Sequence, residues 1–338
     1  MSRIGVLGAG GWALAIAVLL NNNGHKVTVW SKLQSEIDMI KSEGENTKSL
    51  PGIKIPTEIE LTTDINDIAN DKDFLVMAVA SPFVRSTSKE LAALNIPNLK
   101  IVNVAKGIEE STLMTMTQII NDEIPDAKVA VLSGPSHAEE VGRGIPTSCV
   151  IGADEKEFAE YLQDIFMSDV FRIYISPDVL GIEVGGSLKN VIALAAGVVD
   201  GLGYGDNTKA ALITRGIHEI SRLGVAMGGK IETFYGLSGI GDLIVTCASM
   251  HSRNRRAGIL IGQGKTMTEA MEEVHMVVEG VHSAKAAYAL SKKYEIDMPI
   301  VEKVSDILFN DEMNAKDAIT ELMQRDKRIE NANLTWSK

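Results

Sequence analysis

The sequence predicts an α/β domain with a doubly wound, mainly parallel sheet, followed by an all-helical domain. Short strand-like runs alternate with helical segments in the first half of the chain, and such runs stop near Gly181. Nearly continuous apolar strands that alternate with helices are typical of a parallel sheet covered on both faces. We therefore expect one domain at residues 1–180 and a second at residues 181–338, with the site in the cleft between them.

The individual elements follow from hydrophobic patterning. Six runs rich in Val, Ile, Leu and Phe have the length of buried strands, and helical segments separate them. In the second half, Ala210, Ile213, Ile217 and Ile220 fall on one face of a helix. The expected strands are 3–7, 26–30, 74–79, 100–104, 128–132 and 148–151, and the expected helices include 12–23, 83–94, 284–290, 300–308 and 315–323.

Composition excludes several classes of function. The 338 residues carry 33 Lys and Arg against 45 Asp and Glu, a formal charge of −12, which argues against a nucleic-acid partner. An anionic ligand would need a local cationic pocket. Two cysteines and six scattered histidines predict neither a disulfide framework nor a metal site. We find no secretory signal or spanning segment, so we expect a cytoplasmic protein without a stable membrane anchor.

The segment between the first strand and the first helix carries a dinucleotide motif. Gly8, Gly10 and Ala13 form G-x-G-x-x-A. Gly8 allows the tight turn, Gly10 lets the backbone approach a pyrophosphate, and Ala13 lets the helix pack close to the sheet. The helix N-terminus, with Gly11 and Trp12, then offers N–H groups to the phosphates. This context predicts a Rossmann-type cofactor site; a glycine-rich turn without a ligand is the alternative.

The end of the second strand indicates which nicotinamide cofactor fits. An acidic residue there would bind the ribose 2′-hydroxyl of NAD. Here Ser31 and Lys32 follow the strand, and a hydroxyl and a cation suit a 2′-phosphate better. We therefore expect NADP to be accepted alongside NAD, and suspect a preference for NADPH. The alternative for Lys32 is a solvated surface lysine.

Polar and cationic residues stand beside glycines in several later stretches. Lys189 lies within an apolar helical run, where an unpaired ammonium group would be costly, so it needs a partner or a role. A lysine whose ammonium reaches the surface is the alternative. The stretches are 103–107, 133–141, 185–190, 239–243 and 252–254.

On these motifs together, the chain resembles NAD(P)-dependent glycerol-3-phosphate dehydrogenase of the bacterial type, from Gly8 to about Met323. It departs from the family at Ala13-Leu14, where Gly-Thr is more usual, and at His137, where Phe is usual. The shared motifs include Asn46-Thr-Lys-Ser-Leu50-Pro51-Gly52, Lys106-Gly107, Gly134-Pro135-Ser136, the run 183–190, Gly239-Ile-Gly241-Asp242-Leu243, Ser252-Arg253-Asn254 and Val278-Glu279-Gly280.

The resemblance implies a helical domain of the 6-phosphogluconate-dehydrogenase-like kind and hydride transfer between NAD(P)H and C2 of dihydroxyacetone phosphate. It implies that Lys189 moves the proton and that Asp242 orients it. It also implies a supply of glycerol 3-phosphate for phospholipid synthesis. We expect a homodimer only because two-fold dimers are the commonest oligomers. The substrate-binding residues would be Lys106, Gly134, Ser136, Lys189, Asn190, Asp242, Ser252, Arg253 and Asn254. The cofactor would contact Gly8, Gly10, Gly11, Trp12, Ala13, Ser31, Lys32, Lys106, Ala138, Arg253, Val277 and Glu279.

Two other functions compete with this one. Hydroxyacid, 6-phosphogluconate and ketopantoate dehydrogenases share the domain plan, but the cluster around Arg253 favours a phosphate over a carboxylate substrate. A non-catalytic NAD(P) sensor would be expected to lack Lys189 or Asp242. We further expect Arg255 and Arg256 to form a solvated face, and Cys247 to be a small buried hydrophobe.

Overall fold

Eight strands in the described part of the chain form one sheet, in the order β3-β2-β1-β4-β5-β6-β7-β8. The computed structural model describes residues 1–275, 277–310, 313–327 and 329–330. Neighbouring strands are parallel except β6 and β7, which run antiparallel. The doubly wound, mainly parallel sheet predicted from the sequence is therefore confirmed. The strands are β1 (Arg3–Leu7), β2 (Lys26–Trp30), β3 (Glu60–Thr62), β4 (Phe74–Met77), β5 (Lys100–Asn103), β6 (Lys128–Ser133), β7 (Thr147–Ala153) and β8 (Phe171–Ser176).

The two strands that the sequence did not predict are the edge strands, β3 and β8. β3 has only three residues, which gives no readable pattern. In β8, Phe171 and Ile173 are buried whereas Arg172 and Tyr174 are exposed. This strand therefore alternates, as expected where only one face is covered, and lacks the continuous apolar run of the central strands.

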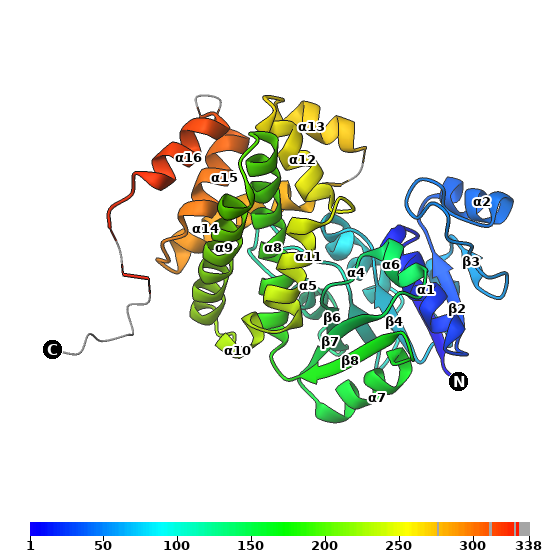
Figure 1. Cartoon of the computed structure of the whole chain (residues 1–338). Coiled ribbons are helices and arrows are strands. Elements are labelled where there is room, and N and C mark those ends of the chain that lie inside the picture. The colour runs from blue at the N-terminus through cyan, green and yellow to red at the C-terminus, as the bar shows by residue number, and fades with distance from the viewer. Residues whose placement is uncertain (276, 311–312, 328, 331–338) are drawn as a thin grey trace.

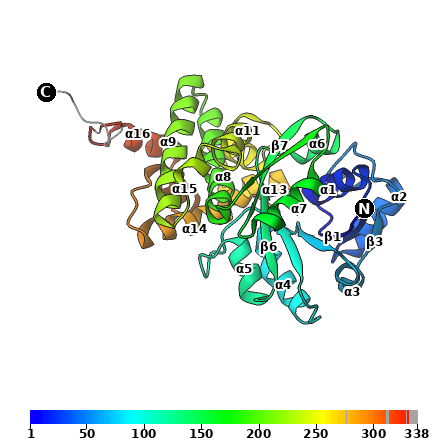
Figure 2. The same ribbon diagram turned by 90° about the horizontal axis from the view of Figure 1, so that it is seen from below.

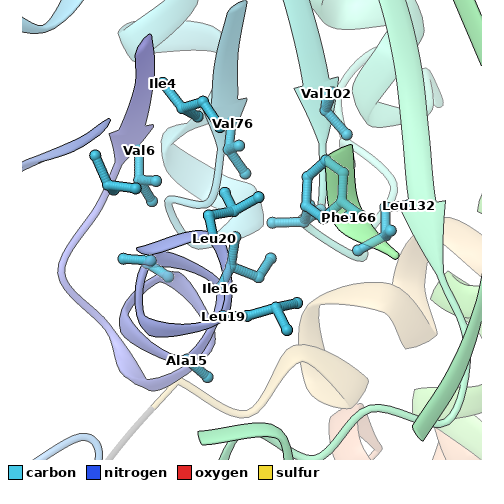
Figure 3. Packing of buried hydrophobic residues seen from close by; sticks show 14 of the residues in the cluster. Ile4, Val6, Ala15, Ile16, Leu19, Leu20, Val76, Val102, Leu132 and Phe166 are labelled. Atoms are coloured by element: carbon cyan, nitrogen blue, oxygen red, sulfur yellow. The ribbon is translucent and has the colours of Figure 1, made fainter. Parts of the chain in front are cut away.

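Helices cover both faces of the sheet (Figures 1 and 2). α1 packs on one face, where its Ile16 and Leu20 meet Val6 and Val76 of the sheet (Figure 3). α4 and α5 pack on the other face. The helices of this part are α1 (Gly11–Asn22), α2 (Gln34–Glu43), α3 (Ile65–Ala69), α4 (Val84–Ala92), α5 (Met116–Glu123), α6 (Ala138–Gly142) and α7 (Lys156–Phe166), with a 3₁₀ turn at Ser81–Phe83.

The second part of the chain is built around α8 (Val179–Gly201), which α9, α11, α12 and α14 contact (Figure 1). Among the described residues α8 alone is long and apolar enough to cross a membrane, but its apolar window is wholly buried. The other helices are α9 (Asp206–Ala226), α10 (Ile231–Phe234), α11 (Asp242–Ala248), α12 (Arg253–Gly262), α13 (Met267–Val274), α14 (Glu279–Lys293), α15 (Pro299–Phe309) and α16 (Ala315–Met323), with a π turn at Leu237–Gly241.

α8 connects the sheet to the helical part. Its Ile182 packs on Val131 and Val150 of the sheet, whereas its later residues form the core of the helical part. The expected division at residue 180 falls in the first turn of this helix. The division into 1–180 and 181–338 stays a prediction.

Glycines bring α12 unusually close to α8. A Cβ added to Gly258 would lie 2.0 Å from the Leu194 carbonyl oxygen, and one added to Gly197 would lie 2.1 Å from that of Arg255. Only residues without a side chain allow backbones to approach this closely. This contact fixes the start of α12, and therefore Arg253, relative to Lys189 of α8.

Candidate active site

A cavity of about 640 Å³ opens where the carboxyl ends of the parallel strands face the helical part. The turn after β1 and the residues that follow β4, β5 and β6 form one wall. Residues of α8, α11, α12 and α14 form the other. Ligands of open α/β sheets bind in this position, outside the carboxyl ends of the strands where the strand order reverses.

The turn after β1 is shaped to receive phosphate groups. Gly8 has φ +121°, and its N–H donates to the Trp30 carbonyl at 2.8 Å. α1 begins with no side-chain cap at Gly10 and no acidic residue in its first turn. A Cβ on Gly10 would meet nothing within 4 Å, so the space beside the turn is open. Free N–H groups at a helix N-terminus that faces a cavity suit the pyrophosphate of a dinucleotide.

A buried asparagine ties a second loop to this turn. The Asn46 amide donates to the Ala9 carbonyl at 3.0 Å, and its oxygen accepts from the N–H groups of Lys48 and Ser49. The Ser49 carbonyl oxygen would lie 2.5 Å from a Cβ on Gly11, so this glycine makes the contact possible. The loop thereby brings Lys48 and Ser49 to the cavity.

Two lysines share one buried carboxylate at the base of the cavity. Lys189 Nζ donates to Asp242 Oδ1 at 2.5 Å and to Thr246 Oγ1 at 2.8 Å. Lys106 Nζ donates to Asp242 Oδ2 at 2.7 Å and to the Gly134 carbonyl at 3.1 Å. Lys106 and Lys189 line the cavity, and Asp242 lies beneath them with 1% of its surface exposed. The carboxylate therefore fixes both ammonium groups.

Burial and mutual contact set the protonation states of these three groups. Burial lowers the pKa of Lys189 to about 8; the Asp242 carboxylate opposes this shift and the Lys106 ammonium adds to it. Burial also acts to lower the pKa of Lys106, but Asp242 outweighs it and the pKa lies above its ordinary value. Burial acts to raise the pKa of Asp242, but the two ammonium groups outweigh it and the pKa is lowered. Lys189 is thus the group in this cluster suited to exchange a proton near neutral pH.

A chain of side-chain amides connects α8 to α12 and α14. Asn254 donates to Asn190 Oδ1 at 2.9 Å and accepts from the Gly280 N–H at 2.8 Å. Asn190 in turn donates to Glu279 Oε2 at 3.2 Å. Asn190, Asn254 and Glu279 all line the cavity beside Lys189. These bonds fix the spacing between the lysine and the first turn of α12.

The first turn of α12 presents two arginines to the cavity. Ser252 caps this helix by accepting the Arg255 N–H at 3.2 Å. Arg253 and Arg256 line the cavity, one helical turn apart. Arg255 points elsewhere and donates to Asp200 Oδ2 at 2.7 Å. The expectation that Arg255 and Arg256 form a solvated face is wrong: both are half-buried, because one is paired and the other faces the cavity.

Two family models cover most of the chain. The N-terminal model of NAD-dependent glycerol-3-phosphate dehydrogenase matches residues 3–159, and the C-terminal model matches residues 178–320. The chain belongs to the NAD-dependent glycerol-3-phosphate dehydrogenase family.

Individual relatives agree with this assignment. The glycerol-3-phosphate dehydrogenase [NAD(P)+] of Agathobacter rectalis is 60% identical over 99% of this chain and 100% of its own length. That of Fusobacterium nucleatum is 59% identical over 98% and 99%. The crystal structure of glycerol-3-phosphate dehydrogenase from Coxiella burnetii is 33% identical, with a TM-score of 0.92 over 96% of this chain and 99% of that one. The predicted family, fold class and enzyme class are confirmed.

Most of the residues predicted to form the site line this one cavity. Those that do not line it include Gly8, Ala13, Gly134, Asp242 and Val277. Those on the wall are Gly10, Gly11, Trp12, Lys106, Ser136, Ala138, Lys189, Asn190, Ser252, Arg253, Asn254 and Glu279. Their roles in binding and catalysis stay predictions.

Ser31 and Lys32 do not line the cavity, and a carboxylate engages each of them. The buried Ser31 hydroxyl donates to Glu36 Oε2 at 2.5 Å, and Lys32 Nζ pairs with Glu90 at 2.6 Å. A 2′-phosphate at the end of β2 would meet Glu36 and compete with Glu90 for Lys32. Because of these two carboxylates, the arrangement gives no support to a preference for NADPH. The sequence pattern did not reveal either glutamate partner.

Several residues on the wall were not predicted as site residues. Lys48 and Ser49 belong to the shared motif Asn46–Gly52. Their contact with the glycine turn after β1 is a contact between distant segments, which the spacing of residues in the sequence does not reveal. The rings of His137 and His251 lie 5.8 Å apart between centroids and are tilted by 54°. Burial lowers the pKa of His137, and the Lys189 ammonium lowers it further. Cys247 is fully buried, as expected. No group of His, Cys, Asp and Glu suited to a metal ion occurs among the residues the structure describes.

Proposed function

We propose that the chain catalyses reversible hydride transfer between NAD(P)H and C2 of dihydroxyacetone phosphate, which gives sn-glycerol 3-phosphate. The observation that carries this proposal is the buried Lys189, held by Asp242 and Thr246 at the wall of a cavity that also contains the dinucleotide turn. Family membership and relatives at 60% identity support the same reaction.

The ammonium group of Lys189 would donate a proton to the C2 carbonyl oxygen of the ketone as the C2–H bond forms. The bound dinucleotide supplies the hydride and is oxidised. In the reverse direction the neutral amine would remove the hydroxyl proton of glycerol 3-phosphate. A pKa of about 8 suits both directions, because each protonation state is populated near neutral pH. Asp242 would orient the amine and keep it from leaving the cavity wall.

The substrate phosphate would bind at the first turn of α12. The guanidinium of Arg253 carries several N–H donors for phosphate oxygens, and the structure shows no ion pair for it among the described residues. Ser252 and Asn254 flank it on the same turn. Lys106, Gly134 and Ser136 would complete the substrate pocket at the carboxyl edge of the sheet. A carboxylate substrate of the related dehydrogenases would need less positive charge than this cavity holds.

The dinucleotide would extend from Lys189 to the turn after β1. Gly10, Gly11 and Trp12 would bind the phosphates, and Ala13 and Gly8 would maintain the turn. Ala138, Arg253, Val277 and Glu279 would surround the nicotinamide end. We infer that the protein uses both NADH and NADPH.

Four broader inferences accompany the reaction. We infer that the enzyme acts in the cytoplasm without a stable membrane anchor. Among the described residues, α8 is the one helix long and apolar enough to span a membrane, and its apolar window is wholly buried. We infer that its product supplies phospholipid synthesis, as the family resemblance implies. A homodimer is the expected assembly, because two-fold dimers are the commonest oligomers. The expected domains are residues 1–180 and 181–338, with the catalytic lysine near the start of the second.

The test is nicotinamide absorbance with three ketones. Purified protein should oxidise NADH and NADPH with dihydroxyacetone phosphate. Dihydroxyacetone, which lacks the phosphate, should react at least about 100-fold less efficiently, because each charge-assisted hydrogen bond contributes about 1.5–3 kcal/mol. Ketopantoate is the control for the related dehydrogenases. Faster turnover of ketopantoate, or binding of cofactor without turnover of any ketone, would contradict the proposal.

A further inference from the structure

The cavity carries an excess of positive charge in a chain whose formal charge is −12. Five cationic side chains line it, against the carboxylates of Glu139 and Glu279 on the wall and of Asp242 beneath. The cations are Lys48, Lys106, Lys189, Arg253 and Arg256. A local excess of cations in an acidic protein indicates that the bound molecules are anionic.

Three of these cations already have an ion-pair partner or a proposed ligand. Lys106 and Lys189 share Asp242, and Arg253 is proposed to bind the substrate phosphate. For Lys48 and Arg256, the described residues provide no ion pair and no side-chain hydrogen bond. The Nε of Arg256 is buried without a partner. An unpaired buried donor is costly, so a ligand oxygen is its natural acceptor.

The direction of Arg256 is set by its place on α12. It lies three residues after Arg253 and therefore on the same face of the helix, about 4.5 Å further along the axis. Asn254, at the start of this helix, is bonded to Asn190 beside the catalytic lysine. Arg256 therefore reaches the cavity one helical turn beyond Arg253, the residue proposed to bind the substrate phosphate.

Lys48 approaches from the sheet side. Its loop is bonded through Asn46 to the Ala9 carbonyl, within the glycine turn, and Ser49 contacts Gly11. Lys48 is exposed, so its ammonium group is free to reach a ligand at this turn. The phosphates expected at the N-terminus of α1 lie beside it.

We propose that Lys48 and Arg256 bind the pyrophosphate of the dinucleotide from opposite walls of the cavity. The loop from Asn46 to Gly52 would supply one cation and α12 the other, so that the bound pyrophosphate bridges the sheet and the helical part. This inference deepens the proposed function and depends on it only for the identity of the ligand, a dinucleotide. It assigns to Arg256 a ligand distinct from the substrate phosphate at Arg253.

The experiment measures NADH affinity by fluorescence, which needs no turnover. Lys48→Met and Arg256→Met should each raise the Kd for NADH about tenfold, and the Kd for ADP-ribose similarly, because ADP-ribose keeps the pyrophosphate. The Kd should also depend less steeply on salt in both variants. The KM for dihydroxyacetone phosphate, measured at saturating NADH, should change less than twofold. Lys41→Met on α2 and Arg172→Met on β8 are matched controls, exposed and away from the cavity.

The outcomes separate this inference from the proposed reaction. An unchanged NADH Kd in both variants, with circular dichroism and Tm like the wild type, would overturn the inference. A raised KM for dihydroxyacetone phosphate with an unchanged NADH Kd in Arg256→Met would place that arginine at the substrate phosphate instead. If wild-type protein binds NADH but turns over no ketone, the proposed function fails, whereas the Kd values still decide the role of these two cations.

Discussion

Asp242→Asn replaces one oxygen of the carboxylate that two buried ion pairs share, and tests how the cluster works. The variant leaves Lys189 and Lys106 buried beside a neutral amide. Removing the carboxylate takes away the interaction that opposes burial, so the pKa of Lys189 should fall below about 8. Reduction of the ketone needs the protonated amine, so the variant should lose part of this activity near neutral pH, most of it in alkali, and regain it in acid.

The size of the effect follows from the cost of breaking a buried pair, about 3–5 kcal/mol. Divided between two lysines, this leaves about 1.5–2.5 kcal/mol for Lys189. At 1.36 kcal/mol for each tenfold change, the population of protonated Lys189 falls about ten- to seventyfold above the wild-type pKa of about 8, and by less at lower pH. Loss of orientation adds to this decrease.

The assay is kcat/KM for dihydroxyacetone phosphate from pH 6 to 9.5 at saturating NADH. In the wild type, reduction should be constant at low pH and fall as the pH rises through about 8, because deprotonation removes the proton donor. Oxidation of glycerol 3-phosphate should show the opposite dependence. In Asp242→Asn the alkaline fall should begin at lower pH. A fall at the same pH as in the wild type would refute the reasoning.

Folding of the variant is the necessary control, since two buried ammonium groups repel each other. The double variant Asp242→Asn/Lys106→Met removes one of them. It should be more stable than the single variant, and its alkaline fall should lie at higher pH, because the repulsion of Lys189 by Lys106 is gone. Equal pH profiles in the two variants would show that Lys106 does not affect Lys189.

Three other substitutions test separate parts of the site. Arg253→Ala should raise the KM for dihydroxyacetone phosphate about 10- to 100-fold, and an unchanged KM would exclude it from the phosphate site. Glu36→Gln should improve kcat/KM for NADPH relative to NADH about fivefold, because a carboxylate near the expected 2′-phosphate is removed; an unaltered ratio would place the 2′ position elsewhere. Gly258→Ala should cost about 1–3 kcal/mol of folding stability and raise the same substrate KM, because its Cβ would lie 2.0 Å from a backbone oxygen of α8. Gly205→Ala, where a Cβ meets nothing within 4 Å, is its control, and equal Tm and KM values for the two would contradict the packing argument.

The sequence predicted what depends on local pattern. The central strands are buried on both faces and read as apolar runs, so their positions agree closely with the expected ones. The glycine motif could be recognised in the sequence because each of its small residues is required by the local geometry of the turn. The half-covered strand β8 and the three-residue β3 carry weaker patterns and were missed.

Long-range pairing could not be predicted in the same way. Nothing in the run from Arg253 to Arg256 shows that Arg255 meets Asp200 while Arg256 faces the cavity; that follows from the orientation of α12 against α8. Likewise, the sequence of Ser31 and Lys32 suits a phosphate, but in the fold the hydroxyl donates to Glu36 and the ammonium pairs with Glu90. The motif around Asp242 was recognised, but its simultaneous contact with Lys106 and Lys189 is a product of the fold.

The central claim is that Lys189 exchanges the proton with the substrate. Its most direct test is Lys189→Met, with kcat measured for dihydroxyacetone phosphate reduction and the Kd for NADH measured on the same protein. The account predicts a decrease in kcat of about 10²–10⁴-fold, while the Kd stays within about threefold of the wild type. A kcat near the wild-type value, in a folded protein that still binds NADH, would contradict it.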